Sequence, residues 1–150
     1  MSGVRVLPDE VQAFLSEELV ATLALPINAA GDIHAASLVF WLDPETNYFY
    51  FVTGRNSEKC QLLLDGHAVQ AACLVGTRKG TPHYLQTRGR VTTVEPQNHK
   101  TELDAYYRKR GNRNDDITAT GNVLLCFIPD WIRWTDYRQG VVVRQLVEQT

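Results

Sequence analysis

The stretch FYFVTGRNSEKCQLLLDG, Phe49–Gly66, decides the fold because its pattern of apolar residues changes halfway along it. Residues 48–53, with the sequence YFYFVT, are aromatic and β-branched, which favours a strand. The apolar positions after the polar turn have helical spacing; they are Cys60, Leu63 and Leu64. Gly66 then stands where a helix commonly ends. The stretch therefore predicts a strand, a short polar turn and a helix in succession.

The polar turn carries the groups that bind a phosphate. Ser57 is a preferred N-cap residue, and the start of a helix leaves unpaired N–H groups and a partial positive charge. Thr53 and Ser57 can donate hydroxyl hydrogen bonds, while Arg55 and Lys59 are cations. Glu58 suits the first turn of a helix but would repel a phosphate that it faced. The same residue types also simply join a strand to a helix, so the turn alone leaves both interpretations open.

Working outward, the sequence shows six further strand patterns and two further helical patterns. The helical patterns begin at Pro8 and Asp9 and, later, cover residues 97–110. The strand patterns, with the one already described, cover 19–25, 33–42, 48–53, 68–75, 83–95, 122–137 and 140–147. The first three, joined by short polar turns, indicate an antiparallel meander. We therefore predict a mainly β (α+β) fold, a small barrel of six to seven antiparallel strands with about three peripheral helices.

Residues 83–95, HYLQTRGRVTTVE, show the clearest alternation between two faces of a strand. One face carries Tyr84, Gln86, Arg88 and Arg90, and the other carries Leu85, Thr87, Gly89 and Val91. The two arginines are typical of a solvated strand face. Tyr84, Trp131 and Trp134 are expected to pack rather than to stack on a ligand. Pro129 is expected at a bulge or on an edge strand.

Size and charge restrict the class of protein. The chain has 150 residues, which predicts one domain over residues 1–150. Its net charge of −2 argues against a nucleic-acid-binding protein, whose domain is normally basic. No stretch has the pattern of a signal peptide or the roughly 20 apolar residues of a membrane span. These features predict a cytoplasmic protein that does not bind a membrane.

The cysteines and histidines show no metal-binding pattern. The three cysteines are widely spaced and predicted to be reduced and buried; they are Cys60, Cys73 and Cys126. The four histidines fall in different predicted elements and lack metal-ligand spacing; they are His34, His67, His83 and His99. No metal site is therefore expected. The sequence also offers no G-x-S-x-G motif and no clear catalytic acid or base.

The succession of these elements resembles the FMN-binding split barrel of the pyridoxamine 5'-phosphate oxidase-like superfamily. The resemblance rests on the strand–T-x-x-x-S-x-K–helix element followed by the R-G-R strand, and it covers about residues 19–95. Residues 97–110 and the strand CFIPDWIRWTDYRQG are similar to a small bacterial branch of the YhbP type. The resemblance implies an FMN-binding flavoprotein with oxidoreductase chemistry, and a homodimer with two cofactor sites at the subunit interface.

The resemblance also implies which residues bind FMN. They are Ala36, Ser37, Leu38 and Val39 beneath the flavin, Thr53, Ser57 and Lys59 at the phosphate, and Tyr84 and Gln86 on a later strand. The middle arginine of the family's Ser-Arg-Lys clamp is Glu58 here, so Arg55 is expected to supply the missing charge. The arginine and lysine that flank the flavin strand in the true oxidases are absent from HAASLVF, which argues against oxidation of pyridoxamine phosphate.

Two alternatives to an FMN oxidoreductase stay open at the level of sequence. The first is a non-enzymatic, dimeric split-barrel binding module. The second is the same fold with F420 or haem as its cofactor. Haem-degrading relatives commonly use a late histidine as the axial ligand, and this chain has none after His99. The acidic tail of F420 would require a more basic groove than this chain offers.

Overall fold

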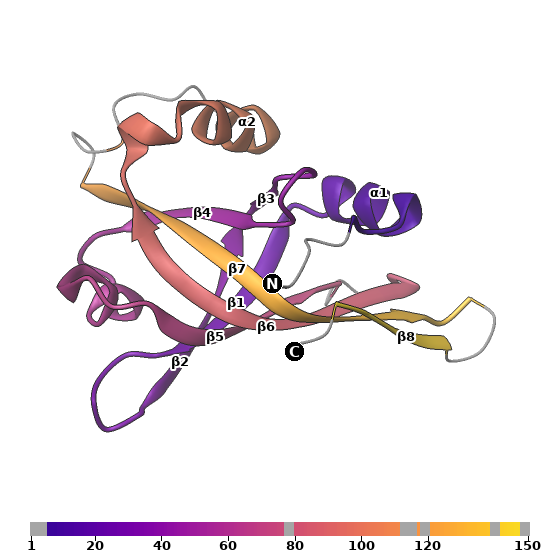
Figure 1. Cartoon of the computed structure of the whole chain (residues 1–150), viewed down its shortest axis with the longest axis horizontal. Coiled ribbons are helices and arrows are strands. Elements are labelled where there is room, and N and C mark those ends of the chain that lie inside the picture. Colours follow the sequence, from indigo (N-terminus) through magenta and orange to yellow (C-terminus); the bar gives the residue numbers. More distant parts are fainter. Residues whose placement is uncertain (1–5, 77–79, 112–116, 118–120, 139–141, 148–150) are drawn as a thin grey trace.

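Eight strands form one antiparallel sheet in the computed structural model, which describes residues 6–76, 80–111, 117, 121–138 and 142–147. The strands are β1 (Val20–Pro26), β2 (Ile33–Val39), β3 (Trp41–Leu42), β4 (Phe49–Gly54), β5 (Val69–Val75), β6 (His83–Val94), β7 (Asn122–Asp136) and β8 (Val142–Val147). Their order in the sheet is β2-β1-β5-β6-β7-β4-β3, and β8 pairs with the second half of β7. The curled sheet in Figure 1 confirms the predicted barrel of antiparallel strands.

Phe40 closes the barrel. It is the single residue between β2 and β3, which stand at opposite ends of the strand order, so the sheet must curl until its two ends meet. The Phe40 side chain is completely buried, and its ring lies 5.5 Å from that of Phe49. The predicted single strand over 33–42 is therefore divided at Phe40, whereas the antiparallel pairings expected on either side of it, β1 with β2 and β3 with β4, are both present. Continuous apolar character hid the point where the chain passes from one end of the sheet to the other.

The alternation predicted for β6 is confirmed. Leu85, Thr87 and Val91 are buried on the inner face, whereas Arg88 and Arg90 are exposed on the outer face. On the other side of the barrel, β4 is buried on both faces because α2 (Lys100–Arg110) covers its outer surface. This double burial explains why residues 48–53 are apolar throughout.

A bulge interrupts the pairing of β6 with β7, as expected for Pro129. Arg88 faces Trp131 and Gly89 faces Pro129, so Asp130 has no partner on β6. Proline donates no backbone hydrogen bond, and a Cβ at position 89 would collide with the carbonyl of Ile128. Glycine at 89 is therefore required by the close approach of the two strands.

The two predicted outer helices are confirmed, but the predicted helix after β4 is not. α1 (Asp9–Glu17) and α2 bury their expected apolar residues. Residues 57–66 instead form two single 3-10 turns, η1 (Glu58–Cys60) and η2 (Leu63–Asp65); a third, η3 (Pro96–Asn98), precedes α2. The Ser57 side chain makes no capping bond to the backbone and instead lies 3.4 Å from the sulfur of Cys60. Gly66 ends the segment with φ 82°, as predicted. Leu64 is exposed, so the segment has too narrow an apolar face for a longer helix.

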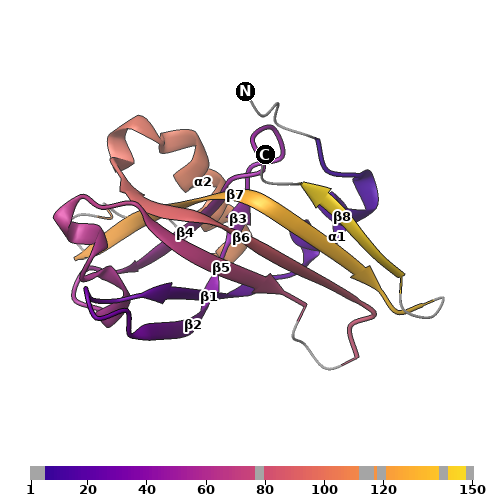
Figure 2. The same ribbon diagram turned by 60° about the horizontal axis from the view of Figure 1, so that its bottom comes forward.

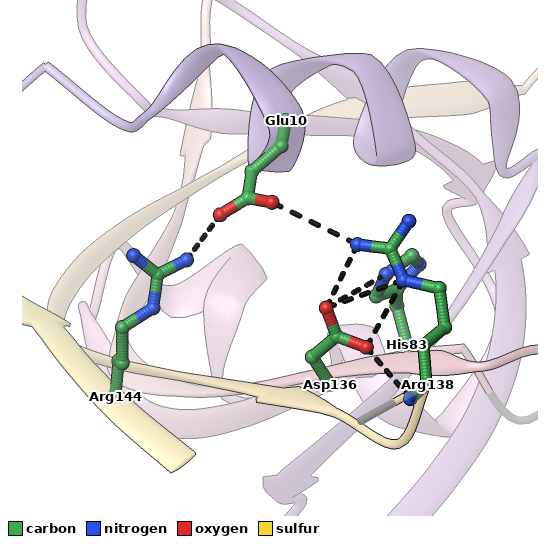
Figure 3. A network of polar contacts seen from close by, with 5 residues as sticks. All are labelled: Glu10, His83, Asp136, Arg138 and Arg144. Carbon is green, nitrogen blue, oxygen red and sulfur yellow. Dashed lines mark hydrogen bonds and ion pairs between the residues drawn. The ribbon is translucent and has the colours of Figure 1, made fainter. Parts of the chain in front are cut away.

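A network of charged residues holds α1 against the end of the barrel (Figure 3). Glu10 on α1 forms ion pairs with Arg144 on β8 and with Arg138, which in turn forms a short pair with Asp136 at 2.8 Å. The Arg138 guanidinium keeps the pKa of the Asp136 carboxyl well below its usual range. His83 stacks on Trp134 and lies 3.4 Å from Asp136. α1 and β8 therefore lie side by side over this end of the sheet, as Figure 2 also shows.

Candidate functional site

The outer face of the sheet brings together strands that the sequence analysis assigned to the cofactor. The strand pairings place five residues in one cross-strand row; they are Ser37, Thr22, Leu74, Gln86 and Arg133. Directly paired residues project to the same face of a sheet. Ser37 and Gln86 thus share a face and a row, separated by three strand spacings of about 4.8 Å, or roughly 14 Å along a flat sheet. Thr22 and Arg133 had no sequence signal, because cross-strand register cannot be read from a single strand.

The remaining predicted residues of β2 and β6 fall on both faces. Val39 and Tyr84 share the outer face with Ser37 and Gln86, according to the alternation along each strand. Ala36 and Leu38 pair with the buried residues of β1 and lie toward the interior, so they can reach an outer ligand only through backbone groups. No residue of β2 itself is fully buried. Within the described ranges, β2 stands at the end of the strand order and pairs only with β1.

The outer face contains two neighbouring hollows. One of about 400 Å³ is lined by small and apolar residues together with polar ones: Thr22, Ala24, Ala72, Cys73, Leu74, Gln86, Thr87, Arg88 and Trp131. The next, of about 360 Å³, shares Ala24, Ala72 and Arg88 with it and extends to Asp130. Because Gln86 lines the first hollow, the predicted flavin residue faces a space with an apolar floor and a cationic rim.

Lys59 is the most unusual residue of the predicted phosphate segment. Its side chain is only 7% exposed, yet it makes no hydrogen bond or ion pair with any residue that the structure describes. Thr53 is also buried, at the end of β4. Burial of a lysine without a counter-charge is rare because the ammonium loses its hydration. The segment therefore holds a cation that nothing within the described chain neutralises.

Glu58 lies away from this cation. Its carboxylate is 67% exposed and lies 3.7 Å from Nδ1 of His34 on β2. No described ion pair joins it to Arg55 or Lys59. The contact also ties the segment to β2, the strand predicted to lie under the flavin. The acid that replaces the family's arginine therefore leaves the lysine charge available to an anion.

Arg55 and Ser57, the other two predicted phosphate residues, make few side-chain contacts. Arg55 is exposed, and its backbone N–H donates to the carbonyl of Gly121 at 2.9 Å. The Ser57 hydroxyl is close to the Cys60 sulfur, which in turn contacts the carbonyl of Gly54. The Arg55 side chain is therefore free to move toward a ligand, whereas Ser57 would have to give up a weak sulfur contact.

Arg88 and Arg133 both contact one tryptophan, Trp131, at the end of the row. The guanidinium carbon of Arg88 lies 4.2 Å from the centre of the Trp131 ring, and that of Arg133 lies 4.9 Å from it. The prediction that Arg88 belongs to an ordinary solvated strand face missed this arrangement. The bulge at Pro129 and Asp130 sets which residue of β7 faces Arg88, so no regular register would have revealed it.

A larger hollow of about 600 Å³ lies between α1 and α2, above β3. Lys109 lines it, donates to the carbonyl of Leu15 at 3.0 Å and lies 3.7 Å from the centre of the Phe40 ring. Burial lowers the pKa of Lys109 to about 8, with Glu18 acting in the opposite direction. This lysine supplies the cation that the C-terminal turn of α1 lacks, so its contacts within the chain account for it.

The cysteines fit the prediction of buried, reduced thiols. All three are free and buried. Burial raises the pKa of Cys126 to about 11 and that of Cys73 further still, which leaves both in the unreactive thiol form. Among the described residues, no group of three or more histidine, cysteine or acidic side chains is arranged to hold a metal ion. The helices of the described ranges are all too short or too polar to span a membrane.

Comparison with solved structures identifies the architecture. A proposed pyridoxamine 5'-phosphate oxidase from Listeria innocua aligns with a TM-score of 0.64 at 20% identity, covering 84% of this chain and 95% of that one. The chain has the pyridoxamine 5'-phosphate oxidase-like split-barrel fold. An F420 reductase aligns with a TM-score of 0.62 at 19% identity, covering 84% of this chain and 98% of that one. The resemblance found in the sequence is thereby confirmed at the level of the fold.

A haem-binding protein from Mycobacterium smegmatis shares the split barrel as well. Its TM-score is 0.69 at 14% identity, and the alignment covers 96% of this chain and 63% of that one. No protein-family model and no curated protein sequence matches the chain. The named split-barrel proteins thus differ in cofactor, and the choice among cofactors has to rest on the residues of this chain.

Proposed function

We propose that the protein binds FMN and acts as a flavin-dependent oxidoreductase. The phosphate would lie at the segment from Thr53 to Lys59, and the flavin ring would lie on the outer face along the row from Ser37 to Gln86. The observation that carries the proposal is Lys59, a residue only 7% exposed whose ammonium makes no hydrogen bond or ion pair with the described residues. A phosphate dianion at this place would supply the missing counter-charge.

The side chains of this segment favour an anionic ligand. Charge-assisted hydrogen bonds from Lys59 and from the Thr53 hydroxyl would stabilise a bound phosphate. Arg55 is exposed and could add a bidentate contact. The segment thus suits the phosphate end of a cofactor better than a neutral ligand.

The protein's part in the chemistry would be to bind and orient. Bound FMN would supply the electron transfer, as flavins do in general. Gln86 would offer its amide to the polar edge of the ring, and the hollow floored by Ala72 and Leu74 would accept the apolar face. The open strand β2 would run along the cofactor and offer its backbone groups.

The proposal includes a homodimer with the cofactor site at the interface. β2 ends the strand order, and within the described residues it pairs along one edge only, with β1. Three large apolar side chains near this edge are exposed; they are Leu19 at 46%, Val20 at 42% and Ile33 at 67%. Exposed apolar side chains beside an open strand are typical of a surface that another chain covers. Light scattering after size-exclusion chromatography tests the assembly directly.

Titration of the purified protein with FMN, followed by flavin absorbance and fluorescence, tests the cofactor. We expect a perturbed flavin spectrum and a Kd below about 100 μM, equivalent to roughly −5.5 kcal/mol. Lys59→Met should weaken binding by roughly 10- to 100-fold, the effect of losing one charge-assisted contact of about 1.5–3 kcal/mol. Lys100→Met, at an exposed position on α2, is the matched control and should change nothing. Equal affinities of the two variants would place the phosphate elsewhere.

A flavin-holding module without turnover is the second candidate. The row of Ser37, Thr22, Leu74, Gln86 and Arg133 contains no carboxylate, imidazole or thiol that could transfer protons beside the ring. Bound FMN that neither NADH nor NADPH reduces would favour this module. Parallel titrations with F420 and haemin separate the other cofactors: tighter binding of F420 or a Soret band would displace FMN from the proposal.

A further inference from the structure

The platform formed by Arg88, Trp131 and Arg133 is a cationic surface that the proposed FMN contacts leave unused. Both guanidinium groups lie over the same indole ring, at 4.2 Å and 4.9 Å from its centre. Stacking on an aromatic ring orients a planar guanidinium and leaves the N–H groups at its edge available. Two such groups in contact with one ring supply several N–H donors for a carboxylate or a phosphate.

Neither arginine is neutralised within the described chain. The described ion pairs of arginine involve Arg138 and Arg144 at the α1 end of the barrel, not Arg88 or Arg133. Asp130 lines the adjoining hollow together with Arg88, but no ion pair joins them. Arg88 is exposed and Arg133 is half-buried, so an incoming anion can reach both.

The platform lies where a second ligand would meet the flavin ring. Arg133 directly follows Gln86 in the cross-strand row, and Arg88 lines the same hollow as Gln86. The floor of that hollow is apolar, with Ala72 and Leu74. A molecule with a flat apolar body and one anionic group therefore matches this end of the site: its body would lie over the floor and its anion on the arginines.

The bulge in β7 positions the platform. Asp130 is the extra residue, so Trp131 rather than Asp130 stands opposite Arg88. Gly89 permits this register because any larger residue there would collide with the carbonyl of Ile128. A regular pairing would have placed the carboxylate of Asp130 against Arg88. Bulges commonly redirect side chains beside functional sites, and this one brings an aromatic ring into contact with two cations.

We propose that Arg88 and Arg133, supported by Trp131, bind the carboxylate or phosphate of the small molecule that exchanges electrons with the flavin. The inference rests on the proposed function for the position of the ring. It adds the class of substrate, an anionic molecule with a flat apolar body. It also adds two specificity residues, Arg88 and Arg133.

The test uses FMN-loaded protein and three probes of one shape: benzoate, phenyl phosphate and neutral benzyl alcohol. Binding is followed by the change in flavin absorbance. We expect at least one anion to bind at least tenfold more tightly than benzyl alcohol, and the ratio of the two anions identifies the preferred group. Arg88→Gln and Arg133→Gln should each weaken anion binding at least fivefold. Arg90→Gln, on the same exposed face of β6 but not in contact with Trp131, should leave it within twofold.

Three results separate this inference from the proposed function. FMN affinity, measured for every variant, should stay within threefold of the unmodified protein. Weaker anion binding by a variant can then not be explained by loss of the cofactor. Arg88→Lys keeps the positive charge but lacks the two parallel N–H donors of a guanidinium. Its affinity for the anion should be intermediate, provided that circular dichroism shows the same fold. Equal binding of benzyl alcohol, or equal effects of Arg88→Gln and Arg90→Gln, would overturn the inference. If FMN itself does not bind, tryptophan fluorescence of the cofactor-free protein reports the anion, with Trp131→Phe removing the signal change.

Discussion

Lys59 is buried and Lys109 is half-buried, and the contacts of their side chains differ. The ammonium of Lys109 donates to Leu15 at 3.0 Å and lies 3.7 Å from the Phe40 ring centre, with Glu18 nearby. Lys59 is 7% exposed and has no such contact among the described residues. The difference separates a lysine that joins two helices from one that makes no described polar contact. Burial alone does not distinguish the two lysines; the presence of a partner does.

The Lys109 ammonium lies over the Phe40 ring, and removal of that ring should have the largest effect on stability of the changes considered. Phe40→Ala should lower the free energy of unfolding by about 3–5 kcal/mol, because it leaves a cavity at the barrel seam and removes the surface beneath the ammonium. Urea denaturation followed by tryptophan fluorescence measures it. A loss below about 1 kcal/mol would mean that the seam is not held by this ring.

The comparison is tested most directly by replacing each lysine with methionine, which has similar length and no charge. In cofactor-free protein, Lys59→Met should change the free energy of unfolding by less than about 0.5 kcal/mol, because Lys59 makes no described polar contact that the substitution removes. Lys109→Met should lower it by about 1 kcal/mol through loss of the bond to Leu15. Denaturation curves of both variants measure the two changes. An equal loss of stability in the two variants would show that Lys59 already has a partner within the chain.

Glu58 offers a way to strengthen the Lys59 region. Glu58→Arg restores the cation of the family's clamp and should tighten FMN binding by roughly 1 kcal/mol, about fivefold, by replacing a nearby negative charge with a positive one. Fluorescence titration measures the change. Glu45→Arg makes the same charge change at another exposed position and is the control. Weaker binding by Glu58→Arg would show that the pair with His34 helps to shape the site.

The smallest expected effect is a pH dependence from Lys109. Its pKa is lowered to about 8 in the folded protein and returns to about 10.5 on unfolding, so unfolding takes up a proton between these values. Stability should therefore rise with pH from about 8 to 10.5, relative to Lys109→Met, by roughly 1 kcal/mol or less after solvent screening. Denaturation midpoints of both proteins across this range measure the difference. If the stability of the unmodified protein relative to Lys109→Met fell as the pH rose, the predicted direction would be wrong.

Local pattern predicted most of the elements. β6 and α2 follow their apolar periods closely, and Leu85, Val91 and Tyr106 are buried as expected. β4 was predicted from its aromatic and β-branched residues alone. The helix expected at 57–66 was wrong because a few apolar residues fit helical spacing without enough buried surface to extend a first turn. Periodicity was reliable where a whole face is buried and misleading where only one or two residues are.

The residues of the candidate site were likewise predictable only in part. The sequence pointed to Lys59 through its charge next to a predicted helix start, which is a local property, and to Gln86 only through the family resemblance. It could not show that Glu58 lies beside His34, since that contact joins β2 to a distant turn. It also could not assemble Arg88, Trp131 and Arg133, because the bulge at Asp130 sets the register of β7.

By itself, the sequence determined the strands, the outer helices and the polar turn after β4, because these depend on the spacing of side chains along one segment. Only the tertiary structure decided where the barrel closes, which outer residues form a row, and which buried lysine has a partner. Those outcomes depend on cross-strand register and on the packing of Phe40 between the two ends of the sheet. Such pairings bring together residues far apart in the chain, and no local pattern records them.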